Sequence, residues 1–351
     1  MSLIFSKIIA SHKQKLPFVC FNKPNTNGLK AYFGKDSSLR YSDSFKEEGF
    51  VFAPFNNDSP SIVFLKETSE IFEELYIKKT TTIPEKKSQE FVTAKKNHLE
   101  LVLNGIDSIK KKLFKKVVLS RKEIIKLPVI DILKVFERLL EKYDNAFVYV
   151  WFHPEVGIWM GATPERLVTL KNGEFHTTAL ASTQNYQGNL NPVWGDKEKK
   201  EHQFVVDYIV SQIKDQQNGI ILKDFTVSET YTVKAGSLLH LKADIKGVID
   251  GFELKNLLNT LHPTPAVCGL PKEAAKSFIL AYENYERTYY TGFLGEINVN
   301  IGTELFVNLR CVEIDGNNAI IYIGGGITAQ SNPEKEWIET CNKTSTIKSV
   351  L

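Results

Sequence analysis

Two segments that are far apart in the sequence each contain a pair of glutamates spaced three residues apart. Glu198 and Glu201 lie in DKEKKEHQF, and Glu336 and Glu339 lie in NPEKEWIET. Residues three apart share a helix face, so each segment can present two carboxylates to one side. Four converging carboxylates repel one another unless a cation lies between them, and oxygen ligands without a Cys or His cluster suit Mg²⁺. Alone, each pair is more typical of a solvated helix face.

A lysine and a run of glycines accompany the second pair. Lys343 follows Glu336 by two helical turns, so it falls on the same face and can balance charge or hold an anionic substrate. Gly324, Gly325 and Gly326 precede the pair and allow a ligand to approach the backbone amides closely. The simpler interpretation of a triple glycine is a turn or a strand end.

Longer motifs connect these features into one pattern. In chain order they are KVVLSR (116–121), GATPERL (161–167), TALAST (178–183), KEKKEH (197–202), LHPTPAVCGLP (261–271), ENYERTYYTGFLG (283–295), VNLR (307–310) and GGGITAQSNPEKEWIETCNK (324–343). The chain resembles the chorismate-utilising enzymes, and within this family it looks most like the isochorismate synthase branch. The resemblance covers about residues 90–351, whereas residues 1–90 match less clearly.

The resemblance implies a reaction in which water adds at C2 of chorismate while the C4 hydroxyl leaves. Such a reaction needs a base, an acid and a cation on the substrate carboxylate. Lys116 corresponds to the general base of the water-using members, and Glu165 corresponds to the general acid. A lysine acts as a base only when it is neutral, and strand alternation lets only one of Lys115 and Lys116 point inward. The alternatives are an ordinary strand-end lysine, and a Glu165 paired with Arg166 or another surface charge.

The resemblance also assigns residues to the substrate and to the metal. Arg310 corresponds to an arginine that grips a substrate carboxylate, and bidentate binding suits a guanidinium group. His262 corresponds to a residue that lines the substrate pocket, whereas His202 is expected to pack or hydrogen-bond within its helix. The glycine amides and Lys343 would hold further carboxylate oxygens. The implied Mg²⁺ ligands are Glu201 and Glu339 directly, and Glu198 and Glu336 through water.

Two positions bear on which branch of the family the chain resembles. Ala266 stands where anthranilate and salicylate producers typically have threonine, and Lys116 is of the water-activating type. Both favour a reaction that stops at isochorismate, with salicylate synthase and the ammonia-using anthranilate and aminodeoxychorismate synthases as alternatives. Ser182 and Thr288 replace glycines that are common in the family. The Ser182 hydroxyl either contacts the substrate or points away. An alternative of another class is a chorismate-binding protein without turnover.

Composition is that of an ordinary soluble globular protein. The 351 residues are 42% hydrophobic and 24% charged, with a net charge of +3. This near balance gives no reason to expect nucleic acid or membrane lipid as a partner. The four unpaired cysteines and the absence of a signal-like segment favour a cytoplasmic protein. By family habit we expect a monomer without a glutaminase subunit.

The hydrophobic patterns predict an α+β fold in which large antiparallel sheets pack as an α/β sandwich with helices outside. Helices are expected at about 91–112, 131–143, 199–216, 271–286 and 333–347, and residues 1–80 are expected to be strands and loops. Asn172-Gly173 predicts a hairpin turn, and a second hairpin should join 305–314 to 319–325. The polar stretch 78–89 is a candidate linker. We expect a single catalytic domain over residues 1–351.

Overall fold

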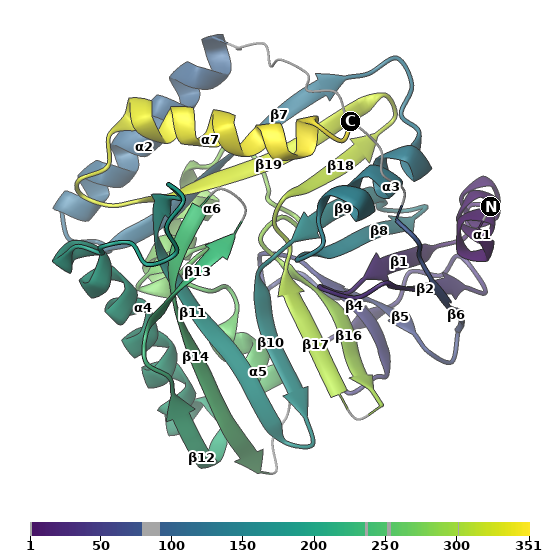
Figure 1. Ribbon diagram of the computed structural model, residues 1–351, viewed down its shortest axis with the longest axis horizontal. Coiled ribbons are helices and arrows are strands. Elements are labelled where there is room, and N and C mark those ends of the chain that lie inside the picture. Colours follow the sequence, from purple (N-terminus) through teal and green to yellow (C-terminus); the bar gives the residue numbers. More distant parts are fainter. Residues whose placement is uncertain (1, 79–91, 236–237, 251–253, 301) are drawn as a thin grey trace.

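The computed structural model describes residues 2–78, 92–235, 238–250, 254–300 and 302–351, and it contains two extended β-sheets (Figure 1). The candidate linker lies outside the described residues except for Lys78. The strands of the first sheet are β1 (Phe18–Asn22), β2 (Gly28–Gly34), β6 (Ser69–Leu75), β7 (Lys116–Lys126), β8 (Phe147–His153), β9 (Gly157–Thr163), β15 (Gly269–Leu270), β18 (Cys311–Asp315) and β19 (Asn318–Ile327).

Along the chain, the strands of the second sheet alternate in groups with those of the first. They are β3 (Tyr41–Ser42), β4 (Gly49–Ala53), β5 (Ser61–Leu65), β10 (Arg166–Lys171), β11 (Glu174–Asn185), β12 (Ile221–Val227), β13 (Tyr231–Ala235), β14 (Leu238–Asp250), β16 (Phe293–Val299) and β17 (Gly302–Val307). The helices are α1 (Leu3–Lys13), α2 (Val92–Lys110), α3 (Ile132–Lys142), α4 (Asp196–Lys214), α5 (Leu254–Leu261), α6 (Lys272–Tyr282) and α7 (Pro333–Lys348).

The strand order mixes distant parts of the sequence. The first sheet runs β15-β7-β19-β18-β9-β8-β1-β2-β6, and the second runs β12-β14-β11-β10-β17-β16-β4-β5-β3, with β13 beside β14. Neighbouring strands are antiparallel, for example β7 with β19 and β4 with β16. This arrangement confirms the predicted α+β class with large antiparallel sheets.

An aromatic layer joins the two sheets. Phe21 of the first sheet lies 5.1 Å from Phe50 of the second, and Phe147 lies 4.5 Å from Phe306, both measured between ring centroids. Large rings bury much apolar surface and gain further from offset contacts. The sheets therefore pack face to face around this layer.

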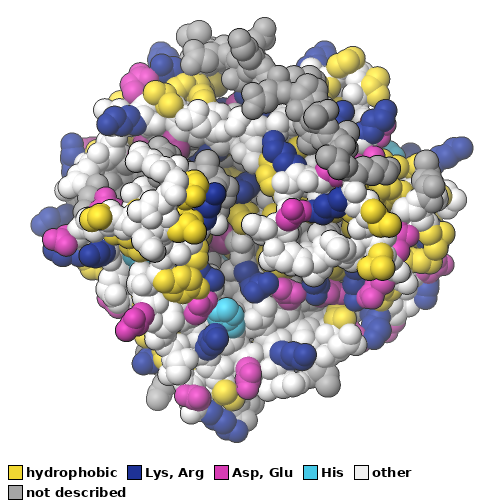
Figure 2. Space-filling view, viewed as in Figure 1, with side chains coloured by type: hydrophobic (Ala, Val, Ile, Leu, Met, Phe, Trp, Pro, Cys, Tyr) yellow, Lys and Arg dark blue, Asp and Glu magenta, His cyan; other side chains and the backbone are white. Residues whose placement is uncertain are grey.

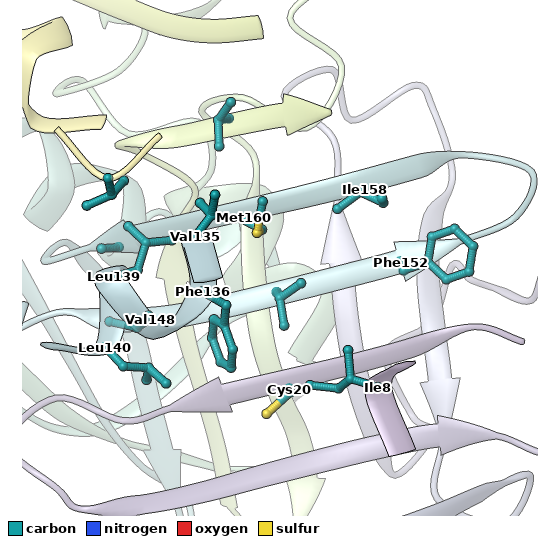
Figure 3. Close-up of a cluster of buried hydrophobic side chains, with 14 of the residues drawn as sticks. Ile8, Cys20, Val135, Phe136, Leu139, Leu140, Val148, Phe152, Ile158 and Met160 are labelled. Atoms are coloured by element: carbon teal, nitrogen blue, oxygen red, sulfur yellow. The ribbon is translucent and has the colours of Figure 1, made fainter. Parts of the chain in front are cut away.

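Helices cover the outer faces of the sheets. α3 places Val135, Phe136 and Leu139 over Val148 and Met160 of the first sheet, and α1 lies on the same face (Figure 3). α4 and α5 bury their apolar residues against the second sheet. α7 packs against α2 and β19 (Figure 1). None of the helices in the described ranges is long and apolar enough to cross a membrane.

Several local predictions are confirmed. The helix expected over 131–143 is α3, and the Asp131 side chain caps it by accepting a hydrogen bond from the Lys134 amide at 3.2 Å. Asn172 and Gly173 form the turn between β10 and β11 with φ values of 52° and 82°, as a primed hairpin turn requires. The helices expected near 199–216 and 333–347 are α4 and α7. α6 ends at Tyr282, earlier than expected.

Two expectations are wrong. Residues 1–80 are not only strands and loops, because α1 occupies Leu3–Lys13. The expected second hairpin is present between β18 and β19, but its expected first arm, 305–314, is divided between β17 in the second sheet and β18 in the first. The chain crosses between the sheets at 308–310, where Arg310 has a φ of 48°. A hydrophobic run cannot reveal such a change of sheet, because both halves are buried alike.

Candidate active site

Lys116 begins β7 and points toward α4. Its side chain is 13% exposed, and its Nζ lies 3.5 Å from Oε1 of Glu201. The neighbouring Lys115 is exposed, with its Nζ 5.0 Å from the centroid of the Phe204 ring. The alternation of the strand thus turns one lysine inward, as predicted, and that lysine is Lys116.

Two glycines leave room for Lys116. A Cβ at Gly326 would lie 3.1 Å from Cε of Lys116, and a Cβ at Gly269 would lie 2.3 Å from its backbone oxygen. Gly269 also has a φ of 146°, a conformation that side chains oppose. A larger residue at either position would have to displace the lysine or its strand.

The glycine run lies on a partly open stretch of β19. Gly324 to Gly326 pair with β7, but the pairing of β19 with β18 ends at Ile321, opposite Val312. Within the described chain, the edge of the glycine run that would face β18 has no strand partner. Backbone amides along an unpaired edge of this kind can bind anions.

Glu165 lies in the short turn between β9 and β10. Part of the residue remains accessible, but protein atoms surround its carboxyl group, and this burial raises its pKa to about 7. The positive charges of Lys116 and Arg310 act in the opposite direction. A carboxyl group in this state keeps its proton up to about neutral pH, which is what a general acid requires.

Arg166 does not pair with Glu165. Its Nη2 lies 3.0 Å from Oε1 of Glu304, and its guanidinium lies over the ring of Phe306. The alternative in which Glu165 and Arg166 form a surface ion pair is therefore excluded. Arg310 lies beside β9, where its backbone oxygen accepts a hydrogen bond from Ala162. Burial lowers the pKa of Arg310, while the negative charge of Glu165 partly offsets this effect.

α7 presents its acidic pair and its lysine to the glycine run. Oε2 of Glu336 would lie 3.4 Å from a Cβ at Gly325, and Nζ of Lys343 donates to the backbone oxygen of Gly324 at 3.1 Å. Lys343 also pairs with Glu339 at 2.7 Å. Burial raises the pKa of Glu336, and the nearby charge of Glu339 adds to the shift. The predicted common face of Glu336, Glu339 and Lys343 is thus present.

α4 presents the other acidic pair. Glu201 faces Lys116, whereas Oε2 of Glu198 lies near the start of the helix, 2.6 Å from where a Cβ of Gly195 would be. Ser182 lies in β11, and its hydroxyl donates to the backbone oxygen of Glu198 at 2.7 Å. This hydroxyl is therefore engaged by the protein and is not directed at a substrate.

The two acidic pairs belong to different helices, α4 and α7, and do not form a closed cluster in the described part of the chain. Among the described residues, no three Asp, Glu, His or Cys side chains surround a point where a metal ion could bind. The chemistry of the donors still suits Mg²⁺, which keeps several waters and takes one or two protein carboxylates. Glu201 is the carboxylate beside Lys116, and Glu336 is the carboxylate beside the glycines.

For two further predicted substrate contacts, His262 and Ala266, the structure shows the local surroundings only. His262 is buried with its ring 5.0 Å from the ring of Phe293, and burial lowers its pKa to about 3. None of its described contacts is with Lys116 or Glu165. Ala266 lies in the loop before β15, next to Val267, whose oxygen accepts a hydrogen bond from Arg287 at 2.9 Å.

Sequence reasoning assigned no role to Tyr290, although it lies in the YTGFLG part of a quoted motif. Its hydroxyl would lie 3.0 Å from a Cβ at Gly324. Burial raises its pKa, and the charge of Glu165 contributes to the shift. Tyr290 therefore lies close to both the glycine run and Glu165, and its place within a motif was the one available signal.

A separate cavity of about 210 Å³ lies beside α5, lined in part by Phe45, Lys255, Leu258 and Phe293. It contains none of the candidate residues. The drawn face of the molecule carries interspersed basic and acidic side chains, in keeping with the small net charge (Figure 2).

The fold and this site define a class of protein. Residues 55–351 match the family described as chorismate binding enzyme. The chain belongs to the chorismate-binding enzyme family.

The chain is similar to several proteins that are named isochorismate synthase. The chain is 29% identical over 259 residues to the salicylate biosynthesis isochorismate synthase of Pseudomonas aeruginosa, covering 71% of this chain and 53% of that protein. The solved structure of MenF, the menaquinone-specific isochorismate synthase of Escherichia coli, superposes with a TM-score of 0.80 at 20% identity, covering 95% of this chain and 88% of that one.

The fold is also shared with a different enzyme. Anthranilate synthase component I of Streptococcus pneumoniae superposes with a TM-score of 0.68 at 16% identity, covering 94% of this chain and 89% of that one. The sequence match spans about half the length of the curated relatives. The match over residues 55–351 therefore identifies the family, whereas the fold is common to enzymes with different reactions.

Proposed function

We propose that the protein is an isochorismate synthase, which converts chorismate to isochorismate with Mg²⁺. The observation that carries this proposal is the placement of Lys116, Glu165 and Arg310. The positive charges of Lys116 and Arg310 act on the carboxyl group of Glu165, whose pKa is about 7. The similar chains named isochorismate synthase support the same reaction.

Each residue has a defined task in the proposed reaction. Lys116 takes a proton from water as the water oxygen bonds to C2 of the ring. The ring double bond shifts, the C4–oxygen bond breaks, and Glu165 gives its proton to the departing hydroxyl, so that water leaves. Arg310 and the open edge of the glycine run hold substrate carboxylates. The net change moves one hydroxyl group and consumes nothing.

The proposed metal ligands are Glu201 and Glu339 directly, with Glu198 and Glu336 acting through water. A bound Mg²⁺ would offset the charge of a substrate carboxylate. Lys343 already balances Glu339 and would add a further positive charge near that carboxylate. The product would enter menaquinone or siderophore synthesis, and the proposed enzyme works without a glutaminase subunit.

The test is chorismate turnover with identification of products by chromatography, in Mg²⁺ and in EDTA. Wild type and Lys115→Ala should form isochorismate in Mg²⁺, because Lys115 is exposed. Lys116→Ala should lose activity by about 10²- to 10⁴-fold, as expected for removal of a general base. Salicylate with pyruvate, or product only with ammonium, would assign the chain to another branch. Saturable binding without turnover would favour the binding protein.

A further inference from the structure

Ser182 has an unusual backbone conformation for a serine. Its φ is 59°, and the register of β11 with β14 shifts between Ala181 and Thr183, on either side of it. A non-glycine residue in this left-handed region has a conformational cost, because its Cβ lies too close to the following carbonyl oxygen. The family motif commonly has glycine at this position, which would adopt the same conformation without that cost.

The hydroxyl of Ser182 has a specific partner. The side chain is buried, and its Oγ donates to the backbone oxygen of Glu198 at 2.7 Å. Glu198 lies in the first turn of α4, whose N-cap residue Gly195 provides no side-chain hydrogen bond. A helix end without a cap is prone to fray. The bond from β11 supplies a tether at this end.

A second tether lies one turn further along α4. His202 is buried, and its Nε2 lies 3.3 Å from the backbone oxygen of Ala179 in β11. Its Nδ1 lies 3.3 Å from Oγ1 of Thr230. Contrary to expectation, the recorded partners of His202 are outside its own helix. Glu201, which faces Lys116, lies between the two tethered positions.

We propose that Ser182 is a positioning residue that fixes the acidic first turn of α4 against β11, so that Glu198 and Glu201 are held in place for a divalent cation. The identity of that cation rests on the proposed function, whereas the tether itself does not. The hydroxyl stabilises the helix end at the expense of a strained backbone. A glycine would relieve the strain and release the turn.

Mg²⁺ binding to the protein without chorismate tests the proposal by calorimetry. Ser182→Gly and Ser182→Ala should both weaken binding about 2- to 10-fold, the effect of one net hydrogen bond. Ser211→Ala is the matched control, because it removes a hydroxyl that bonds to the backbone oxygen of Tyr208 within the same helix. This control should bind Mg²⁺ as wild type does.

Thermal unfolding separates the hydroxyl from the backbone. Ser182→Gly should have a higher Tm than Ser182→Ala, because only glycine removes the strain. Weaker Mg²⁺ binding in both variants, despite different Tm values, would support the tether. Mg²⁺ binding in Ser182→Gly that equals wild type would overturn it.

Hydrogen exchange of the backbone amides in residues 199–203 distinguishes failure of this proposal from failure of the proposed function. Wild type that neither binds Mg²⁺ nor consumes chorismate would refute the function. Faster exchange in both Ser182 variants than in wild type and Ser211→Ala would still support the tether. Unchanged exchange would refute the tether.

Discussion

Nη2 of Arg287 lies 2.6 Å from Oε1 of Glu283, and both side chains are only 1% exposed. The guanidinium also donates to the backbone oxygens of Val118 at 2.7 Å and Val267 at 2.9 Å. The carboxylate accepts a hydrogen bond from the amide of Ser120 at 2.7 Å. This buried ion pair thus joins β7, which begins with the proposed base, to the loop before β15.

Removing one member of this pair should destabilise the protein strongly. Glu283→Ala leaves the Arg287 guanidinium buried without its counter-charge, which typically costs about 3–5 kcal/mol. Urea unfolding should show this loss. Glu70→Ala is the control, because Glu70 pairs with Lys7 on the surface, and exposed pairs contribute little to stability. A Glu283→Ala loss no larger than that of the control would contradict the role of the pair.

Turnover should depend on pH through Glu165. A general acid acts in its protonated form, so the rate should fall about tenfold per pH unit above the pKa of about 7. Glu165→Gln should lower the rate by about 10²- to 10⁴-fold and remove this alkaline limb. The measurement is kcat/KM between pH 5 and 9, which reports the pKa of the free enzyme. If the rate of Glu165→Gln still fell above about pH 7, that fall would belong to another titrating group.

The same carboxyl group should make stability depend on pH. Its pKa is raised from the ordinary 4.5 to about 7 in the folded protein, so ionisation is harder there than in the unfolded chain. Wild type should therefore lose stability relative to Glu165→Gln as pH rises from about 4.5 to about 7, with no further change above. Parallel urea titrations of the two proteins measure this difference. A constant difference across the range would show that the carboxyl is not buried as described.

Gly326→Ala should impair turnover without unfolding the protein. The new Cβ would lie 3.1 Å from Cε of Lys116, so the side chain must move. A displacement of about 1 Å in a reacting group can cost about 10²-fold in rate. Gly28→Ala is the control, because a Cβ at Gly28 meets nothing within 4 Å. Equal activities of the two variants would show that the position of Lys116 tolerates the methyl group.

The protein should be more stable with glycine at position 288 than with alanine. Its φ is 47°, in the left-handed region, where a Cβ costs about 1–2 kcal/mol. Urea unfolding of Thr288→Gly and Thr288→Ala measures the difference. At Ser6, an exposed position within α1, the variant with alanine should instead be more stable than the variant with glycine, because alanine favours a helix by about 1 kcal/mol. The same order at both positions would argue against strain at Thr288.

Local features of this fold could be predicted because their causes lie within a few residues. Asp131 caps α3 through a hydrogen bond that spans three residues, and Asn172-Gly173 adopts the turn that its composition favours. The alternation of side chains along a strand predicts that only one of Lys115 and Lys116 points inward. The helix α1 was missed although Ser2 caps it by accepting from the Phe5 amide, and although Ile4 and Ile8 share its buried face. These two signals were present in the sequence.

Features that depend on distant partners could not be predicted. The spacing of Glu198 and Glu201 places them on one helix face, but the distance from α4 to α7 depends on the packing of two sheets. The division between β17 and β18 depends on which strands lie beside each half of one buried run. The role of the Ser182 hydroxyl depends on its hydrogen-bond partner, the backbone oxygen of Glu198, which lies on another element.

The pairing of β4 has a consequence for how the chain is made. β4 pairs with β5 on one side and with β16 on the other, where Ala53 lies opposite Phe293. Synthesis from the N-terminus therefore exposes one edge of β4 until β16 leaves the ribosome. During that interval Phe50 and Phe52 lack the buried surroundings that they have in the finished protein. An unpaired strand edge with apolar side chains is prone to aggregation until its partner strand is added.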